Sequence, residues 1–189
     1  MNFREVVNRR RSIRKYQQKA VPAESLRNIM EQVRLSPTAA NLQRLRYKVV
    51  SSEPIVKELF ALTVYGAMVK PRRSPVWGVD APQAFVAVMA PETSVSEYAN
   101  AGAAIQTLML AATEEGLGSC WVGAFDKQKT EALLEVPEGM NILYVVALGY
   151  AAETPMWEDG KAGELKYYLD ETDRLHVPKL TLDQLVDWR

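Results

Sequence analysis

Residues 96–115, SEYANAGAAIQTLMLAATEE, constrain the fold of this chain more than any other stretch. The pattern predicts one long helix that ends at Gly116. Alanine and glycine occupy several of its faces, and Leu108, Met109 and Leu110 place apolar surface on neighbouring directions. A helix that is apolar nearly all round must be buried. It lies either against a partner chain, which we favour for a chain of 189 residues, or at the centre of its own core.

Four apolar stretches are typical of strands, with lengths and flanking residues that suit buried sheet positions. They are RYKVVSS (46–52), AFVAVMA (84–90), SCWVGAF (119–125) and ILYVVALGY (142–150). The remaining helices are expected after Asn2, from Pro22 to before Pro37, around 55–62, and after a cap at Asp126. Residues 66–82 are expected to form a loop, and within 151–189 only the closing LTLDQLVDW suggests an element, as an amphipathic piece.

This order of elements indicates an α+β fold in a single domain, 1–189. Neither GxGxxG nor GxxxxGK[ST] occurs, so the usual dinucleotide and P-loop signatures are absent. A single cysteine, Cys120, excludes an internal disulfide, and the only histidine, His176, is distant in sequence, which disfavours a Cys–His pair or a metal site. The first ten residues lack the apolar core of a secretory signal, and no run of about 18 apolar residues occurs. We therefore expect a cytoplasmic protein without membrane contact.

A local concentration of positive charge stands out in RRRSIRKY (9–16), because the whole chain carries 23 basic and 23 acidic residues. A neutral chain argues against general nucleic-acid binding, which requires many phosphates to be neutralised. In extended backbone Arg10, Ser12 and Arg14 face one side, where guanidinium and hydroxyl donors suit a phosphate. The alternative is a solvated basic patch.

Two further stretches place small or polar residues beside exposed backbone. In SPTAANLQ (36–43), Thr38, Asn41 and Gln43 accompany two alanines that let a flat ligand approach, although an ordinary turn has similar composition. In GLGSCWVGAF (116–125), two glycines before a strand and one inside it expose backbone N–H groups at a strand end.

In this order and spacing, the three stretches resemble the FMN-dependent nitroreductase family over nearly the whole chain. RRSIRKY is similar to the family's phosphate-binding signature, and SPTAANLQ to its Ser-Pro-(Ser/Thr)-x-x-Asn-x-Gln loop. GLGSCWVGAFD, followed by LLEVPEGMNILYVVALGYAAETP, resembles its Gly-Leu-Gly strand, its Pro-Glu segment and its Leu-Gly-Tyr ending. The resemblance implies a nitroreductase-like fold, with a central, mostly antiparallel sheet flanked by helices, in an intertwined homodimer.

The resemblance also implies FMN as cofactor and NADH or NADPH as electron donor. Arg10 and Ser12 would meet the phosphate and Arg14 the ribityl and ring oxygens, while Pro37, Thr38 and Asn41 would come from the opposite chain. The side chains would bind and orient FMN, and none need act as an acid or base. The expected FMN-binding residues are Arg10, Arg11, Ser12, Arg14, Pro37, Thr38, Ala39, Asn41, Gln43, Trp121, Val122, Gly123 and Lys179.

The implied reaction is ping-pong hydride transfer to planar aromatic acceptors such as nitroaromatics and quinones. A flavin carrier or regulator without turnover, and a specialised relative such as a reductive dehalogenase, are the alternatives. The chain departs from the family pattern at Arg44-Leu45, where Pro-Trp is usual, at 63–82, and at 156–177. Trp77, Trp157, Tyr167 and Tyr168 lie in the last two departures, where they could cover the acceptor or pack a dimer surface.

Overall fold

The computed structural model describes residues 1–66 and 74–189. The loop expected at 66–82 is described from residue 74 onward, and its part at 67–73 lies outside the described residues.

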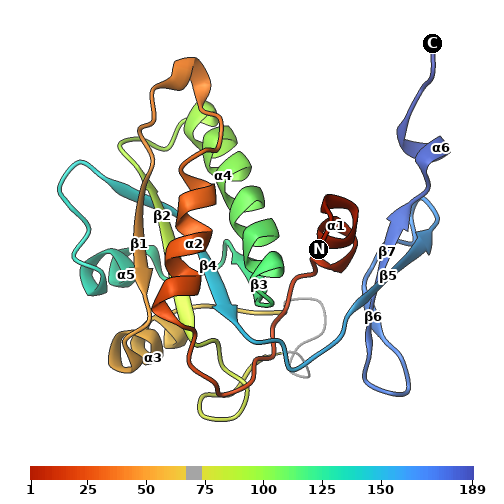
Figure 1. Cartoon of the computed structure of the whole chain (residues 1–189), viewed down its shortest axis with the longest axis horizontal. Helices are drawn as coiled ribbons and strands as arrows, with labels where there is room; N and C mark the ends of the chain where they lie inside the picture. The colour runs from red at the N-terminus through yellow and green to blue at the C-terminus, as the bar shows by residue number, and fades with distance from the viewer. Residues whose placement is uncertain (67–73) are drawn as a thin grey trace.

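A four-stranded antiparallel sheet forms the centre of the molecule (Figure 1). Its strands, in spatial order, are β1 (Arg46–Val50), β2 (Ala84–Ala90), β4 (Asn141–Gly149) and β3 (Gly118–Val122). All four coincide with the strands predicted from the sequence, within a few residues at the ends. The expected α+β fold with a central antiparallel sheet is confirmed.

Helices cover both faces of this sheet. Successive residues of β2 point to opposite faces and therefore enter two different cores. Val86 and Val88 join a cluster with α2 (Ala23–Val33) and α4 (Val95–Glu114), whereas Phe85 and Ala87 join one with α3 (Glu53–Ala61). Figure 1 accordingly places α2 and α4 on one side of the sheet and α3 with α5 (Lys127–Leu133) on the other. The short helices are α1 (Phe3–Arg9), a 3₁₀ turn at Ala39–Asn41, and α6 (Leu182–Leu185).

Two positions were considered for the long helix α4, against a partner chain or in the core of its own chain, and its own core buries one of its sides. One side is buried in its own chain, with Ala101, Ile105, Leu108 and Ala112 in the core cluster. The other side keeps small residues at or near the surface, including the exposed Ala99. Its own core therefore accounts for only part of its apolar surface.

Within 151–189 only the closing piece was expected to form an element, and this expectation is wrong. A second, three-stranded sheet forms there from β5 (Met156–Gly160), β7 (Leu175–Leu180) and β6 (Tyr168–Leu169). β5 pairs with β7 in parallel and β6 pairs with β7 antiparallel. This C-terminal sheet stands beside α1, apart from the central sheet, and the chain continues from it as an arm (Figure 1).

Candidate functional site

The basic segment lies in extended backbone and is joined to the ends of β3 and β4. Ile13 N donates a 2.8 Å hydrogen bond to Ser119 O, and Ser12 forms a parallel bridge with Ser119. Further along, Gln17 N donates to Tyr150 O at 2.8 Å, and Ala152 N donates to Lys15 O at 2.9 Å. Local sequence does not make this segment a strand by itself; the neighbouring backbone supplies its hydrogen bonds.

Two glycines make this close approach possible. A Cβ at Gly118 would lie 2.7 Å from Cγ1 of Ile13, and a Cβ at Gly149 would lie 2.9 Å from Cδ1 of Tyr16. Real carbon atoms do not approach this closely, so any other residue would push the segment away. The segment RRSIRKY thus packs against Gly118 of GLGS and Gly149 of LGY.

Two of the residues that form this junction carry buried polar atoms without partners. Nε of Arg10 and Oγ of Ser119 are both buried and have no hydrogen-bond partner within the described protein. A buried polar group without a partner costs free energy, and a charged donor costs more than a neutral one. Arg10 Nε therefore lacks an acceptor among residues 1–66 and 74–189, and a bound anion would supply one.

A carboxylate that sequence analysis did not single out holds the segment. Glu153 Oε1 accepts hydrogen bonds from the backbone N–H groups of Arg14 at 2.5 Å and Lys15 at 3.2 Å. The guanidinium of Arg14 lies 5.5 Å from the ring centroid of Tyr167, within cation–π range. Only its place three residues after the LGY ending could have pointed to Glu153.

The odd-numbered side chains of the segment gather together, as alternation in extended backbone requires. Arg11 and Ile13 alternate in this way and line a cavity of about 480 Å³, which Arg9, the last residue of α1, also lines. The Arg11 guanidinium is bonded to the carbonyl oxygens of Asn8 and Arg10. Burial and the charge of Arg10 lower the pKa of Arg11.

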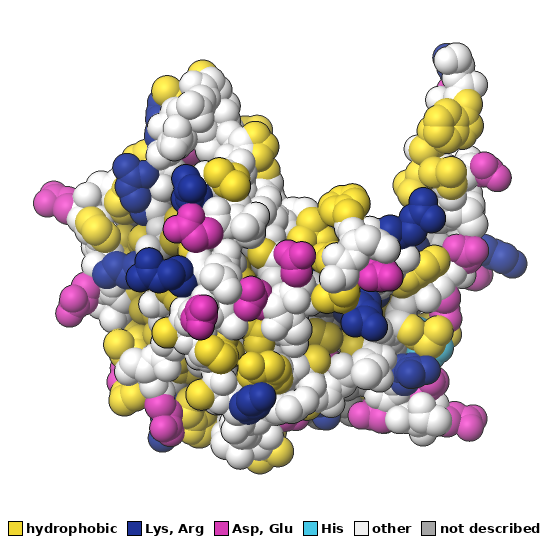
Figure 2. All heavy atoms as spheres, in the orientation of Figure 1, with side chains coloured by type: hydrophobic (Ala, Val, Ile, Leu, Met, Phe, Trp, Pro, Cys, Tyr) yellow, Lys and Arg dark blue, Asp and Glu magenta, His cyan; other side chains and the backbone are white. Residues whose placement is uncertain are grey.

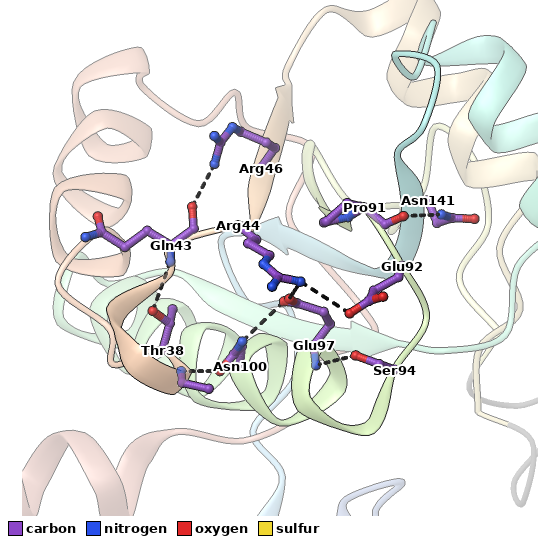
Figure 3. A network of polar contacts seen from close by, with 11 residues as sticks. Thr38, Gln43, Arg44, Arg46, Pro91, Glu92, Ser94, Glu97, Asn100 and Asn141 are labelled. Carbon is purple, nitrogen blue, oxygen red and sulfur yellow. Dashed lines mark hydrogen bonds and ion pairs between the residues drawn. The ribbon is translucent and has the colours of Figure 1, made fainter.

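The second predicted stretch, 36–43, forms a tight loop against the N-terminal half of α4 (Figure 3). Ala40, Asn41 and Gln43 have φ of 50°, 53° and 50°, a left-handed conformation that non-glycine residues rarely adopt. Gln43 N donates to Oγ1 of Thr38 at 3.1 Å.

A polar network connects this loop to α4 (Figure 3). Ala39 N donates to Oδ1 of Asn100 at 3.0 Å, and Nδ2 of Asn100 donates to Glu97 Oε2 at 3.2 Å. Glu97 is almost fully buried, and its other oxygen lies 3.6 Å from Nη1 of Arg44. The backbone strain is thus balanced by contacts from side chains that sequence analysis left unassigned.

Within one chain, the two predicted parts of the FMN site, the basic segment and the loop 36–43, lie apart. The loop 36–43 is bonded to Asn100, whereas the cavity beside the basic segment is lined by Thr113 and Gly116 at the other end of α4. At about 1.5 Å per residue, thirteen residues of helix separate these ends by roughly 20 Å.

The predicted strand residues lie at the end of β3, which begins beside the basic segment. The Trp121 ring is 37% exposed and meets Tyr144 edge-on at 4.9 Å between centroids, whereas Val122 is buried. The position of Gly123 leaves ordinary contact space toward Tyr144. Lys179 is exposed on β7, opposite Asp159, in the C-terminal sheet.

The aromatic residues of the unfamiliar segments divide into three groups. Trp77 is partly buried, packs against its own core and meets Phe60 at 5.9 Å between ring centroids. Tyr167 reaches the basic segment through Arg14. Trp157 and Tyr168 are each 45% exposed.

Cys120 behaves as a small apolar residue. Burial raises the pKa of its thiol to about 11, which keeps it protonated and poorly nucleophilic at neutral pH. Across residues 1–66 and 74–189, no group of histidine, cysteine and carboxylate side chains is arranged to hold a metal ion. None of the helices in these ranges has the length and apolar character that spanning a bilayer requires.

Comparison with known proteins identifies relatives over nearly the whole chain. Residues 7–150 match the model of the nitroreductase family. A Methanothermobacter thermautotrophicus protein with the provisional name NADH dehydrogenase/NAD(P)H nitroreductase is 30% identical over 188 residues, 95% of this chain and 88% of that protein.

Solved structures agree with this result. A provisionally assigned nitroreductase from Desulfovibrio desulfuricans, solved in complex with FMN, has 27% identity and a TM-score of 0.67 over 88% of this chain and 96% of that one. The FMN- and NADPH-dependent nitroreductase NfnB of Sphingopyxis sp. strain HMH has 20% identity and a TM-score of 0.72 over 100% and 99%. The second likeness concerns the fold.

Proposed function

The chain belongs to the nitroreductase family, and from this premise we propose that it is an FMN-dependent NAD(P)H oxidoreductase. Its acceptors would be planar aromatic molecules, nitro compounds or quinones. The FMN bound by one relative and the cofactors named for another support this choice of cofactor and donor. We place the activity in the cytoplasm, where the buried, unpaired Cys120 would stay reduced.

One observation carries the proposal: the buried, unpartnered Nε of Arg10. An FMN phosphate would supply the acceptor that this donor lacks, and Ser119 Oγ, on the strand that bonds the same segment, also has no partner. The extended segment presents Ser12 at the same junction, bridged to Ser119. The residues present therefore fit a phosphate group.

The remaining residues would orient the cofactor. FMN, when bound, supplies the redox chemistry, accepting a hydride and passing electrons on. Arg14 would place its positive charge beside the ring oxygens, where it favours the negatively charged reduced form. The backbone at Trp121, Val122 and Gly123 would lie against the ring edge. Lys179 would add to the phosphate contacts once the C-terminal sheet is in place.

A homodimer is part of the proposal, since one chain keeps its two binding elements at opposite ends of α4. A second copy whose α4 runs antiparallel to the first α4 would place loop 36–43 of one chain beside Arg10 of the other. The incompletely covered face of α4 supports this arrangement, because small side chains let backbones pack closely. The C-terminal arm carries exposed apolar side chains (Figure 2) that a partner would cover; they are Leu182, Leu185 and Trp188.

The proposal is tested in three steps on purified protein. FMN content should be close to one per chain, and the apparent mass should be that of two chains. Under argon, NADH or NADPH should bleach the flavin, whereas a carrier without turnover would stay oxidised. Stopped-flow mixing of the reduced protein with nitroaromatics, quinones, halogenated phenols or oxygen should show acceleration by planar acceptors. Reoxidation by oxygen alone would contradict the general reductase function.

The substitution Arg10→Ala should lower FMN affinity by about 1–3 kcal/mol, the usual scale for losing a charge-assisted hydrogen bond. Fluorescence titration of FMN into the FMN-free protein measures this difference. Arg9→Ala is the matched control, because Arg9 is an exposed arginine on the α1 side of the same segment and should change little. Unchanged FMN affinity in Arg10→Ala would show that Arg10 does not bind the cofactor.

A further inference from the structure

We propose that Glu97 is a positioning residue for the flavin-binding loop 36–43, acting through Asn100 and Arg44. This inference rests on the proposed function and concerns how the loop is held ready for FMN. It starts from a carboxylate that is 2% exposed, in the first turn of a helix that otherwise buries apolar surface. A buried charge is retained only where partners compensate its desolvation.

The partners of Glu97 give this carboxylate a directional role. A carboxylate can only accept hydrogen bonds, so Glu97 Oε2 draws the NH₂ group of Asn100 toward itself at 3.2 Å. This orientation turns the amide oxygen of Asn100 toward the loop, where it accepts the Ala39 N–H at 3.0 Å. If the side-chain amide of Asn100 were reversed, its NH₂ group would face the Ala39 N–H, and both of these groups are donors. Glu97 thus fixes the contact that anchors the start of the strained loop.

The second oxygen of Glu97 reaches the other end of the loop. Arg44 directly follows the left-handed Gln43, and its Nη1 lies 3.6 Å from Glu97 Oε1. Glu92 is nearer to Arg44, at 3.3 Å, but its side chain is 57% exposed against 3% for Glu97. Arg44 itself is 43% exposed, so solvent screens both pairs, but it screens the pair with the buried Glu97 less than the pair with Glu92.

These contacts hold a conformation that the loop residues would not choose alone. Ala40, Asn41 and Gln43 all have positive φ, and each such non-glycine residue costs free energy in the FMN-free chain. Thr38 accepts from Gln43 N, and Arg46 Nη1 donates to Gln43 O at 2.9 Å, which pins the loop end from β1. Without Glu97, the loop would relax and FMN would have to reorder it on binding.

The test compares Glu97→Gln and Arg44→Gln, singly and together, with Glu31→Gln as control. Glu31 also pairs with an arginine, Arg34 at 2.6 Å, but both side chains are more than half exposed. We expect each of the two single variants to weaken FMN binding about tenfold. The double variant should lose less affinity than the product of the two single losses, because the residues share one network. The control should match the parent. FMN fluorescence titration gives the affinities.

Two further measurements separate positioning from general stability. The melting temperature of the FMN-free variants should stay near that of the parent, while hydrogen exchange at the Ala39 amide becomes faster. The visible circular dichroism of bound FMN should also change in Glu97→Gln, because the loop contacts the cofactor differently. A merely structural role would instead lower the melting temperature and FMN affinity in parallel.

The failures are distinguishable. If the parent binds FMN but the affinities of both variants stay within about twofold of it, a factor below the usual coupling of contacting residues, the role of Glu97 is overturned and the proposed function stands. If the parent does not bind FMN, the proposed function is overturned. The exchange measurement on FMN-free protein then still decides whether Glu97 holds the loop.

Discussion

The two sheets of this chain are stabilised in different ways. In the central sheet, neighbouring residues such as Phe85 and Val86 point to opposite faces and are both fully buried, so apolar burial supplies the free energy. In the C-terminal sheet, many side chains remain exposed and the closest contacts are polar. His176 lies between Glu158 Oε2 at 2.8 Å and Asp170 Oδ2 at 3.0 Å, and Tyr168 stacks on its ring.

The difference teaches which parts of the chain can vary without loss of the binding site. The central sheet fixes the junction where Ser12 meets Ser119, and its stability is shared with both helical layers. Tyr167, directly before β6 of the C-terminal sheet, contacts Arg14 of the basic segment. Opening of the C-terminal sheet would therefore alter the surroundings of Arg14 while the central fold persists.

The largest expected effect comes from truncating one buried leucine in each sheet. Leu148→Ala in β4 should lower the free energy of unfolding by about 2–5 kcal/mol, the range for a large-to-small change in a packed core. Leu175→Ala in β7 should affect that free energy less. Leu175 is buried but, among the described residues, belongs to neither of the two core clusters. Urea denaturation followed by fluorescence measures both.

Hydrogen exchange sharpens this comparison. In Leu175→Ala, amides of β7 should lose protection while those of β2 and β4 keep theirs, because local opening then costs less than global unfolding. Equal losses of free energy in both variants, with uniform loss of protection, would show that the two sheets unfold as one unit.

A smaller effect is expected at the junction between the basic segment and the central sheet. Gly118→Ala would place a Cβ 2.7 Å from Ile13 and displace the segment, at a typical cost of about 1–3 kcal/mol for overpacking. The same variant should bind FMN more weakly, since Ser12 moves with Ile13. Thermal denaturation and FMN titration measure the two effects.

Gly123→Ala is the control for this change. A Cβ there would meet Tyr144 at 3.8 Å, an ordinary contact, so thermal stability should stay close to that of the parent. If Gly118→Ala were as stable as Gly123→Ala, the close approach of the basic segment would not be what requires glycine at this position.

The sequence predicted the central sheet because burial on both faces produces continuous apolar runs such as AFVAVMA. It did not predict the C-terminal sheet, since MWEDG carries acidic residues and pairs in parallel with a strand that starts 15 residues later. That pairing depends on contacts of His176, which become visible only when Glu158 and Asp170 are brought to it.

The same contrast holds for the candidate site. RRSIRKY, GLGS and LGY were recognised separately, as motifs that resemble those of a family, and the structure shows that they meet because Gly118 and Gly149 leave space for the basic segment. Glu153 and Glu97 were missed, because a single glutamate in a sequence does not reveal which backbone N–H or amide it will meet.

The smallest and most local effect is the pH dependence of the C-terminal sheet. Hydrogen bonds to Glu158, and then to Asp170, raise the pKa of His176 above its ordinary value of 6.5. The stabilisation that protonated His176 gives to the C-terminal sheet is therefore fully present below about pH 6.5 and is lost as pH rises through the raised pKa. His176 also lowers the pKa of Glu158, so on the acid side the contribution of Glu158 is lost only as pH falls through this lowered value.

The single imidazole of the chain makes this prediction easy to follow by NMR. Its ring protons should titrate above pH 6.5 in the parent, and β7 amides should exchange faster, relative to those of β4, above that titration. Glu158→Gln should lower the pKa of His176, because the partner that raises it most is neutralised. Tyr168→Phe should change it little, since both carboxylates and the stacked ring remain. If His176 titrated at its ordinary value in the parent, the polar contacts would not be what stabilises the C-terminal sheet.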